Sequence, residues 1–346
     1  MVCGPWRAIS RGRRAYQPLK SIGSRQAPGR TPSAVTARSG SGTTRVTRSL
    51  RFFAWASFVA QVTIIATGGA VRLTGSGLGC PTWPTCTAES LVPTDELTYH
   101  SLIEFGNRMM TGVVGIIALV VFVLVWRIRR ERRDLFTLSF IVGVGIVAQA
   151  IVGGITVWTG LNPFIVGFHY VSSLALVCVT AAFLARMDSP AGPREPAVPG
   201  WYAGLTHLTS AVLLVSIVFG VLTTGSGPHS GDAEAGRTGF DSEILEHVHA
   251  WPGYALLVLT LVLVVAAWRL KLPTLRWSIA LLAVELVQVG VGLYQARNGL
   301  PAFAVGVHMV LAALTAAAMT IVIMRLKRPV AADAAAEASP VEASAH

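Results

Sequence analysis

Charged residues are scarce in this chain of 346 residues: Lys, Arg, Asp and Glu together make up 13% of it, about half the usual share in a soluble globular protein. Hydrophobic residues make up 53%, and most of them stand in long runs with almost no charge. Eight of these runs approach the roughly 20 residues that a helix needs to cross a bilayer. The scarcity of charge excludes an ordinary soluble domain and predicts that the chain lies in a lipid bilayer, which is then its main partner.

The predicted fold class is therefore an all-α integral membrane protein with eight transmembrane helices. The expected spans cover residues of about 52–71, 103–126, 135–157, 164–185, 202–222, 247–268, 277–296 and 302–324.

Cations are missing from alternate loops, which indicates the orientation. Residues 73–99 contain no Lys or Arg and residues 223–246 contain only Arg237, whereas residues 127–133 contain five arginines. Because Lys and Arg concentrate in cytoplasmic loops, we expect both termini in the cytoplasm. The expected location is the cell membrane, with the mitochondrial inner membrane as the alternative.

Acidic residues are missing from residues 1–50, which carry ten of the cations behind the net charge of +11. The segment resembles a mitochondrial transit peptide in composition. We expect a disordered basic cytoplasmic tail over 1–50, because such a segment cannot bury a core. A transit peptide and a start codon assigned too early are the alternatives. Because the positive charge lies in this tail, it does not predict a nucleic-acid partner. Residues 327–346 are expected to form a second disordered tail.

Only four cysteines are present. Cys80 and Cys86 stand in one short loop that is predicted to face the oxidising side of the membrane, where disulfides form. We predict a disulfide between them, and two free thiols are the alternative reading. Their spacing is not a common one for metal sites.

An internal repeat organises the chain. Residues 149–169 align without a gap on residues 288–308 with nine of 21 positions identical, including the first Gln and the last His. The repeat predicts an N-terminal half over 51–186, a cytoplasmic linker over 187–200 and a C-terminal half over 201–326. Each half has an even number of spans, so the two should be related by an axis along the membrane normal.

Ionisable groups inside spans are costly and usually functional. Glu104 and Asn107 open the second span, and the repeat aligns them with Glu246 and His249, which open the sixth. His247 must point to a different helix face from His249. The alignment favours His249 as the inward residue and leaves His247 as the alternative.

The histidines that end the repeated segment, His169 and His308, are expected to face the buried interior of their halves. Two imidazoles on facing helices are typical of the axial ligands of a haem, and His249 is the partner expected for His308. Zinc would need three or four ligands at each site. The alternative is that these histidines only form hydrogen bonds between helices.

Four motifs together resemble the haem A synthase family, over residues of about 50–325. They are Gly77-Leu-Gly-Cys-Pro-Thr-Trp-Pro84, Ile103-Glu-Phe-Gly-Asn-Arg108, Gln149-Ala-Ile-Val-Gly-Gly-Ile-Thr156 and Val305-Gly-Val-His308. The resemblance implies oxidation of a ring methyl group of haem O to the formyl group of haem A. It implies a haem b cofactor in the C-terminal half, with His249 and His308 as ligands, and haem O in the N-terminal half. Implied partners are an unidentified electron donor, haem O synthase and cytochrome oxidase assembly factors.

One departure from the family concerns the second span, where members often have Glu-x-x-His-Arg and this chain has Asn107 before Arg108. His169 therefore lacks the usual second imidazole. His100 lies on the same helix face as Asn107, about two turns or 10 Å further along the axis. Either His169 alone binds the substrate haem, or His100 reaches it from the rim.

Glu104 is the predicted catalytic residue, and a structural pair with Arg108 is its alternative. Arg108 is also a candidate contact for the substrate haem, because Arg72, Arg108, Arg237 and Arg297 all lie near the outer interface. They suit haem propionates, but snorkelling to the interface explains their places equally well.

Two other functions compete with haem modification. A dihaem b-type electron-transfer protein or reductase would have a histidine pair in both halves, which Asn107 disfavours. A transporter built from repeats usually binds its substrate near the midplane, whereas these polar residues lie near the outer face.

Overall fold

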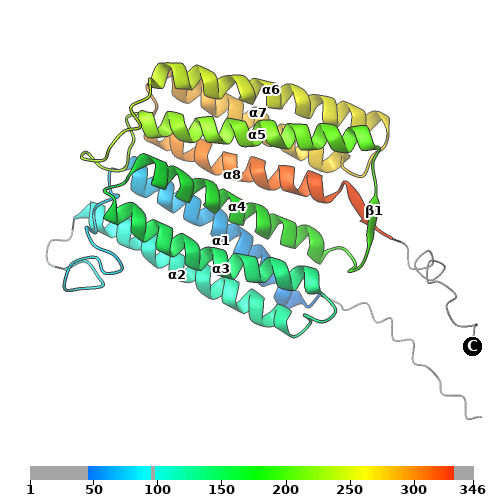
Figure 1. Cartoon of the computed structure of the whole chain (residues 1–346), viewed down its shortest axis with the longest axis horizontal. Coiled ribbons are helices and arrows are strands. Elements are labelled where there is room, and N and C mark those ends of the chain that lie inside the picture. The colour runs from blue at the N-terminus through cyan, green and yellow to red at the C-terminus, as the bar shows by residue number, and fades with distance from the viewer. Residues whose placement is uncertain (1–45, 95–97, 331–346) are drawn as a thin grey trace, which may run out of the picture. The chain divides into compact units, whose positions relative to one another are not determined.

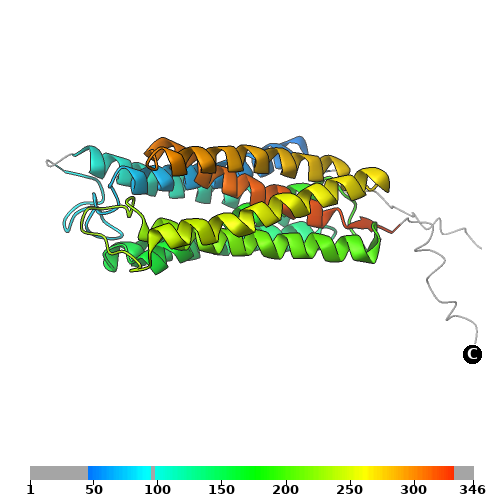
Figure 2. The same cartoon turned by 90° about the horizontal axis from the view of Figure 1, so that it is seen from above.

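The computed structural model describes residues 46–94 and 98–330, in which eight α-helices run alongside one another (Figures 1 and 2). Each is long and apolar enough to cross a membrane, so the predicted all-α membrane fold is confirmed. The helices are α1 (Arg48–Leu73), α2 (Tyr99–Trp126), α3 (Arg133–Trp158), α4 (Pro163–Met187), α5 (Gly200–Ser226), α6 (Ser242–Arg269), α7 (Leu275–Arg297) and α8 (Ala302–Met324). Most of the two predicted tails lies outside the described residues.

Several helices begin earlier than their hydrophobic spans because polar residues cap them. Thr98 and Ser101 form a capping box at the start of α2. The side chain of Asp241 accepts hydrogen bonds from two backbone amides at the start of α6, five residues before the predicted edge at 247. The first amides of a helix have no partner within the helix, so these caps stabilise turns that hydrophobicity alone does not indicate.

The two halves show the same pattern of helix contacts. In the N-terminal half, α1 and α3 each pack against both α2 and α4; in the C-terminal half, α5 and α7 each pack against both α6 and α8. Helices α2 and α4 therefore lie diagonally opposite each other, and so do α6 and α8. The halves meet where α8 packs against α1 and α4, and where α4 packs against α5.

The buried positions also recur from one half to the other. The buried residues in the second half of α2 are Val114, Ala118, Val121 and Val125, and those of α6 are Leu256, Thr260, Leu263 and Ala267. Each α6 residue stands 142 positions after its α2 counterpart. Both residues are apolar in every pair except Ala118 and Thr260, where the second residue is polar.

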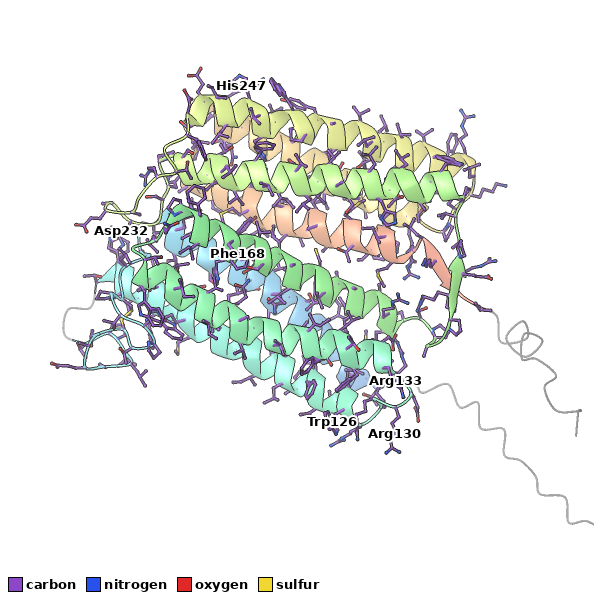
Figure 3. The ribbon with its side chains drawn as sticks, viewed as in Figure 1. Trp126, Arg130, Arg133, Phe168, Asp232 and His247 are labelled. Atoms are coloured by element: carbon purple, nitrogen blue, oxygen red, sulfur yellow. A yellow bond between two sulfur atoms is a disulfide. The ribbon has the colours of Figure 1, made fainter. Side chains whose placement is uncertain are left out.

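The outward faces of the helices are apolar and suit a lipid environment. Phe52, Phe168 and Trp251 are among many large hydrophobic residues that are more than half exposed. Charge gathers at the two ends: Arg130 and Arg133 lie at one end of the bundle and Asp232 at the other (Figure 3). We call the end with loops 74–98 and 227–241 the long-loop end and the opposite end the short-loop end.

A two-stranded antiparallel sheet joins the two halves at the short-loop end. Strand β1 (Arg194–Pro196) pairs with β2 (Lys327–Pro329), and Arg328 forms an ion pair with Glu195 at 2.8 Å. The sequence placed residues 327–329 in a disordered tail and 194–196 in a plain linker. In the structure residues 327–329 form a strand rather than part of a disordered tail, and the linker residues 194–196 pair with them, which satisfies backbone groups of both segments.

Candidate functional site

His249 and His308 face each other inside the C-terminal half. Their rings come from the diagonally opposite helices α6 and α8, and the ring centroids are 6.1 Å apart with the planes 82° from parallel. Of the two alternatives on α6, the structure therefore directs His249 inward. His247 is exposed and bonds the backbone carbonyl of Glu243 on its own helix, on the side of α6 turned away from the other helices (Figure 3).

Glycines on the neighbouring helices make room for both rings. A Cβ atom at Gly220 of α5 would lie 2.8 Å from the His249 ring, and one at Gly292 of α7 would lie 3.2 Å from the His308 ring. The Nδ1 atom of His249 lies 2.9 Å from the carbonyl oxygen of Ser216. Because a carbonyl oxygen can only accept a hydrogen bond, Nδ1 carries the proton and donates it. The Nε2 atom of His249 is therefore the nitrogen left to act as a ligand.

The spacing of this pair fits a haem. A metal–imidazole nitrogen bond is about 2 Å long and the ring centroid lies about 1 Å behind the nitrogen, so two imidazoles on opposite sides of an iron have centroids about 6 Å apart. The observed separation is 6.1 Å. The donor set also fits, since two imidazoles on facing helices are typical of the ligands of a haem iron.

The N-terminal half contains the equivalent of one of these histidines. His169 on α4 packs against Gly153 of α3, where a Cβ atom would lie 3.5 Å from the ring, just as His308 packs against Gly292. Its Nδ1 atom is buried and has no hydrogen-bond partner among the described residues. Gln149 bonds the His169 carbonyl at 3.1 Å and the Ser173 hydroxyl at 2.9 Å, which ties α3 to α4 at this level.

Asn107 occupies the position that corresponds to His249. The Thr67 hydroxyl donates to its side-chain oxygen at 2.7 Å, so the amide is tied to α1. One half of the molecule thus has two facing imidazoles, and the other has one imidazole and an amide.

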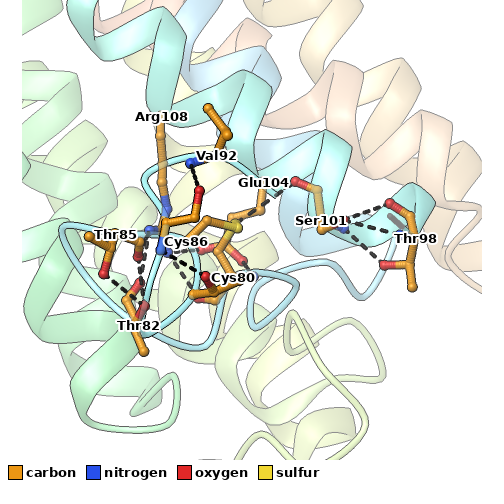
Figure 4. The surroundings of a disulfide bond; sticks show 11 residues. Cys80, Thr82, Thr85, Cys86, Val92, Thr98, Ser101, Glu104 and Arg108 are labelled. Carbon is orange, nitrogen blue, oxygen red and sulfur yellow. Dashed lines mark hydrogen bonds and ion pairs between the residues drawn. A yellow bond between two sulfur atoms is a disulfide. The ribbon is translucent and has the colours of Figure 1, made fainter. Parts of the chain in front are cut away.

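Glu104 and Arg108 hold the first long loop in place (Figure 4). Glu104 is 5% exposed, accepts from the Cys80 amide at 2.7 Å and pairs with Arg108 at 2.5 Å. Arg108 donates to three loop carbonyls, those of Cys80, Thr82 and Thr85, at 2.8 to 3.0 Å. These contacts match the structural alternative for Glu104, and they direct the Arg108 guanidinium towards the loop. The repeat-related Glu246 is exposed.

The same loop reaches the wall of the N-terminal site. Its Trp83 packs so closely on α3 that a Cβ atom at Gly154 would lie 2.5 Å from the indole, and it meets Trp158 edge to face at 5.4 Å. Gly154 follows Gly153, which contacts His169. The loop therefore packs on α3 within one residue of the position that contacts His169.

His100 belongs to the rim of this site. Its Nδ1 atom lies 3.0 Å from the Ser76 hydroxyl, and a Cβ atom at Gly79 would lie 2.6 Å from the His100 backbone. These contacts connect His100 to the loop rather than to His169.

Cys80 and Cys86 form a disulfide, as the sequence predicted, and both are almost completely buried. We expect the mass of the untreated protein to rise by two hydrogens on reduction. The peptide that carries both cysteines should resist alkylation until it is reduced, whereas Cys178, a free cysteine, should react once the protein is denatured. Alkylation of Cys80 or Cys86 without reduction would contradict the prediction.

Two polar side chains have surroundings that the sequence did not predict. Arg72 of α1 donates to the carbonyls of His229 at 2.7 Å and Thr224 at 2.8 Å, so it connects the two halves rather than lying free for a propionate. Glu285 is buried in the middle of α7. An acidic residue inside a predicted span was the available signal for Glu285.

Comparison with known proteins gives one family and several relatives. The model of the family described as "Cytochrome oxidase assembly protein" matches residues 51–228, which is 178 of the 346 residues. A protein named "Heme A synthase" from Lysinibacillus sphaericus is 38% identical over 141 residues, 40% of this chain and 45% of that protein. Proteins of the same name from Geobacillus kaustophilus and Listeria welshimeri are 34% and 33% identical, over 43% and 41% of their own lengths. The chain thus matches less than half the length of these relatives.

Proposed function

The chain belongs to the family of cytochrome oxidase assembly proteins, and on this basis we propose that it is a haem A synthase, a membrane oxidoreductase that converts a ring methyl group of haem O into a formyl group. The family predicted from the sequence motifs agrees with this match. The observation that carries the proposal is the inequality of the two halves: His249 and His308 face each other at 6.1 Å, whereas His169 shares its half with Asn107.

In this proposal, His249 and His308 hold a b-type haem, which supplies one-electron transfer when bound. The protein's own contribution is orientation. The hydrogen bond from His249 Nδ1 to Ser216 keeps the ring in one tautomer, and the glycines at 220 and 292 leave space for both rings. A hydrogen bond to the nitrogen of a histidine that does not bind the metal usually orients the ring and raises its affinity for the metal.

The substrate, haem O, is assigned to the N-terminal half with His169 as its ligand. The position that corresponds to His249 is Asn107, and its amide is bonded to Thr67. This half therefore offers one facing imidazole instead of two, which suits a site of oxidation rather than of permanent electron transfer. The loop with Trp83, which packs on α3 beside the residue that contacts His169, is the proposed cover of this site. Asn107, His100 and the Glu104–Arg108 pair form the rest of the proposed pocket wall.

Glu104 is the proposed catalytic residue. It stands three residues before Asn107 on α2, in the half assigned to the substrate, where a group that holds a proton or stabilises positive charge could act on the reacting methyl. Arg108 and the Cys80 amide fix its position. We place the protein in the cell membrane with both termini in the cytoplasm, and it needs an external electron donor.

The main alternative is a dihaem b-type electron-transfer protein, and the haems of the purified protein separate the two functions. We expect acid–acetone extracts to contain haem B together with haem O and haem A. A preparation with two haem B molecules per chain and neither haem O nor haem A would support the electron-transfer protein. The matched control is protein from cells that make no haem O, which should retain haem B alone.

A further inference from the structure

Glu285 is a carboxylic acid in the middle of α7, within a membrane span. It is 3% exposed. The Thr260 hydroxyl of α6 donates to its Oε1 atom at 2.9 Å. Its Oε2 atom is buried and has no hydrogen-bond partner among the described residues. A buried acid with one free oxygen is costly in a membrane and is usually kept for a function.

The internal repeat shows that the fold does not require this acid. The position equivalent to Glu285, 139 residues earlier, is Ile146, and the position equivalent to Thr260, 142 residues earlier, is Ala118. Ile146 and Ala118 belong to one apolar cluster in the N-terminal half. The same helix packing therefore works with an apolar pair, and the polar pair is peculiar to the half with two facing histidines.

The histidine pair lies beside the same face of α7 as Glu285, further along the helix. Gly292 lies seven residues further along the helix, which is about two turns and 10 Å, and it contacts the His308 ring. Gln288 lies between them on the same face, and its side-chain oxygen is buried without a partner among the described residues. Glu285 is thus too far away to be a ligand but near enough for its charge to act through a medium of low dielectric constant.

The other titratable groups on the helices around Glu285 are remote. Helices α6 and α8 pack against α7, and α6 presents Thr260 at this level. The only titratable residue within α8 is His308. On α6, His249 and Arg269 stand eleven and nine positions from Thr260, and Tyr254 is exposed. On α7 itself the titratable residues are Arg276, Tyr294 and Arg297, each nine or more positions away. Glu285 is therefore the titratable group buried at this level of the half, whereas Glu246, three residues before His249, lies at the exposed start of α6.

Hydroxyl groups line the same face of α7 on the other side of Glu285. Ser278 precedes it by seven residues, and together with Thr274 it meets the Tyr202 hydroxyl at 3.4 and 2.9 Å. All three are completely buried. This cluster lies towards the short-loop end. Polar groups therefore follow one another along this face of α7 from the short-loop end to Glu285, except at Leu281.

We propose that Glu285 is a proton-binding site coupled to electron transfer at the His249–His308 pair. The carboxylate takes up one proton from bulk water as one electron arrives from a one-electron reductant, and it returns the proton when the electron leaves. The net charge buried in this half then stays constant, which avoids adding an uncompensated charge to a low-dielectric interior. The inference rests on the proposed function, because it assumes a haem between the two histidines.

Redox titration of the purified, haem-loaded protein with dithionite at several pH values tests this coupling. The midpoint potential of the wild-type haem should fall as pH rises, by up to about 59 mV for each tenfold change in proton concentration, the value for one proton per electron. Glu285→Gln should lose this dependence. An infrared difference spectrum between reduced and oxidised protein should contain a carboxyl C=O band that disappears in the variant. The matched control is Glu243→Gln, which removes an exposed acid of α6 six residues from His249 and should keep both signals.

The outcomes separate this inference from the function on which it rests. If Glu285→Gln keeps the wild-type pH dependence or the carboxyl band, the coupling is disproved while the function stands. If the wild-type protein has no haem with two histidine ligands, both are disproved. Glu285→Ile serves as the second variant in case the Gln variant does not fold, because the N-terminal half already packs Ile at this position.

Discussion

His308→Ala is expected to remove the low-spin haem spectrum of the purified protein, with haem B content at least about tenfold lower than in the wild type. Loss of a residue that only hydrogen-bonds a metal ligand typically lowers metal affinity about 10- to 100-fold, and loss of the ligand itself should lower the affinity further. His249→Ala should have the same effect, because the two rings face each other at 6.1 Å. Visible spectra of the reduced protein and haem extraction measure both results.

His247→Ala is the matched control, since His247 lies only two residues from His249 and is exposed. That variant should keep the haem spectrum. His169→Ala should also keep haem B but lose haem O and haem A from the extract. A low-spin haem B spectrum that survives both His249→Ala and His308→Ala would show that the C-terminal pair does not hold the haem.

Glu104→Gln is expected to lower haem A formation by about 10²- to 10⁴-fold, the range that general acid–base groups contribute, while haem B is retained. Glutamine has nearly the shape of glutamate and still accepts a hydrogen bond from the Cys80 amide, but it carries no charge and cannot take a proton. The extract should then contain haem O or a hydroxylated intermediate in place of haem A. Chromatography of the extracted haems measures both quantities.

Arg108→Gln distinguishes chemistry from loop structure. Arg108 holds three loop carbonyls in addition to Glu104, so its loss should loosen the loop more than Glu104→Gln does. If Glu104 acts only through the loop, Arg108→Gln should impair haem A formation at least as strongly. Normal haem A formation in Glu104→Gln would reduce Glu104 to a structural partner of Arg108.

The eight helices, the family and the disulfide were predictable from sequence because each depends on residues close together in the chain: an apolar run, short motifs and two cysteines in one loop. A run of about 20 apolar residues must span a bilayer as a helix whatever its neighbours are. Cys80 and Cys86 stand six residues apart in one loop, so their pairing needed no knowledge of the fold. The helix ends were less predictable, because the caps at Thr98 and Asp241 lie outside the apolar runs.

Tertiary structure alone decided which way the polar side chains face. The sequence put His247 and His249 on different faces of α6 and favoured His249 as the inward one, but only the packing of α6 against α5 and α7 set His249 opposite His308. Glu104, Glu285 and Arg72 likewise bond residues that are distant in sequence, namely Cys80, Thr260 and Thr224. The strand pairing of 194–196 with 327–329 joins segments more than 130 residues apart. Composition and spacing determine that a segment crosses the membrane; the rotation of each helix about its own axis depends on contacts with helices that are distant in the sequence.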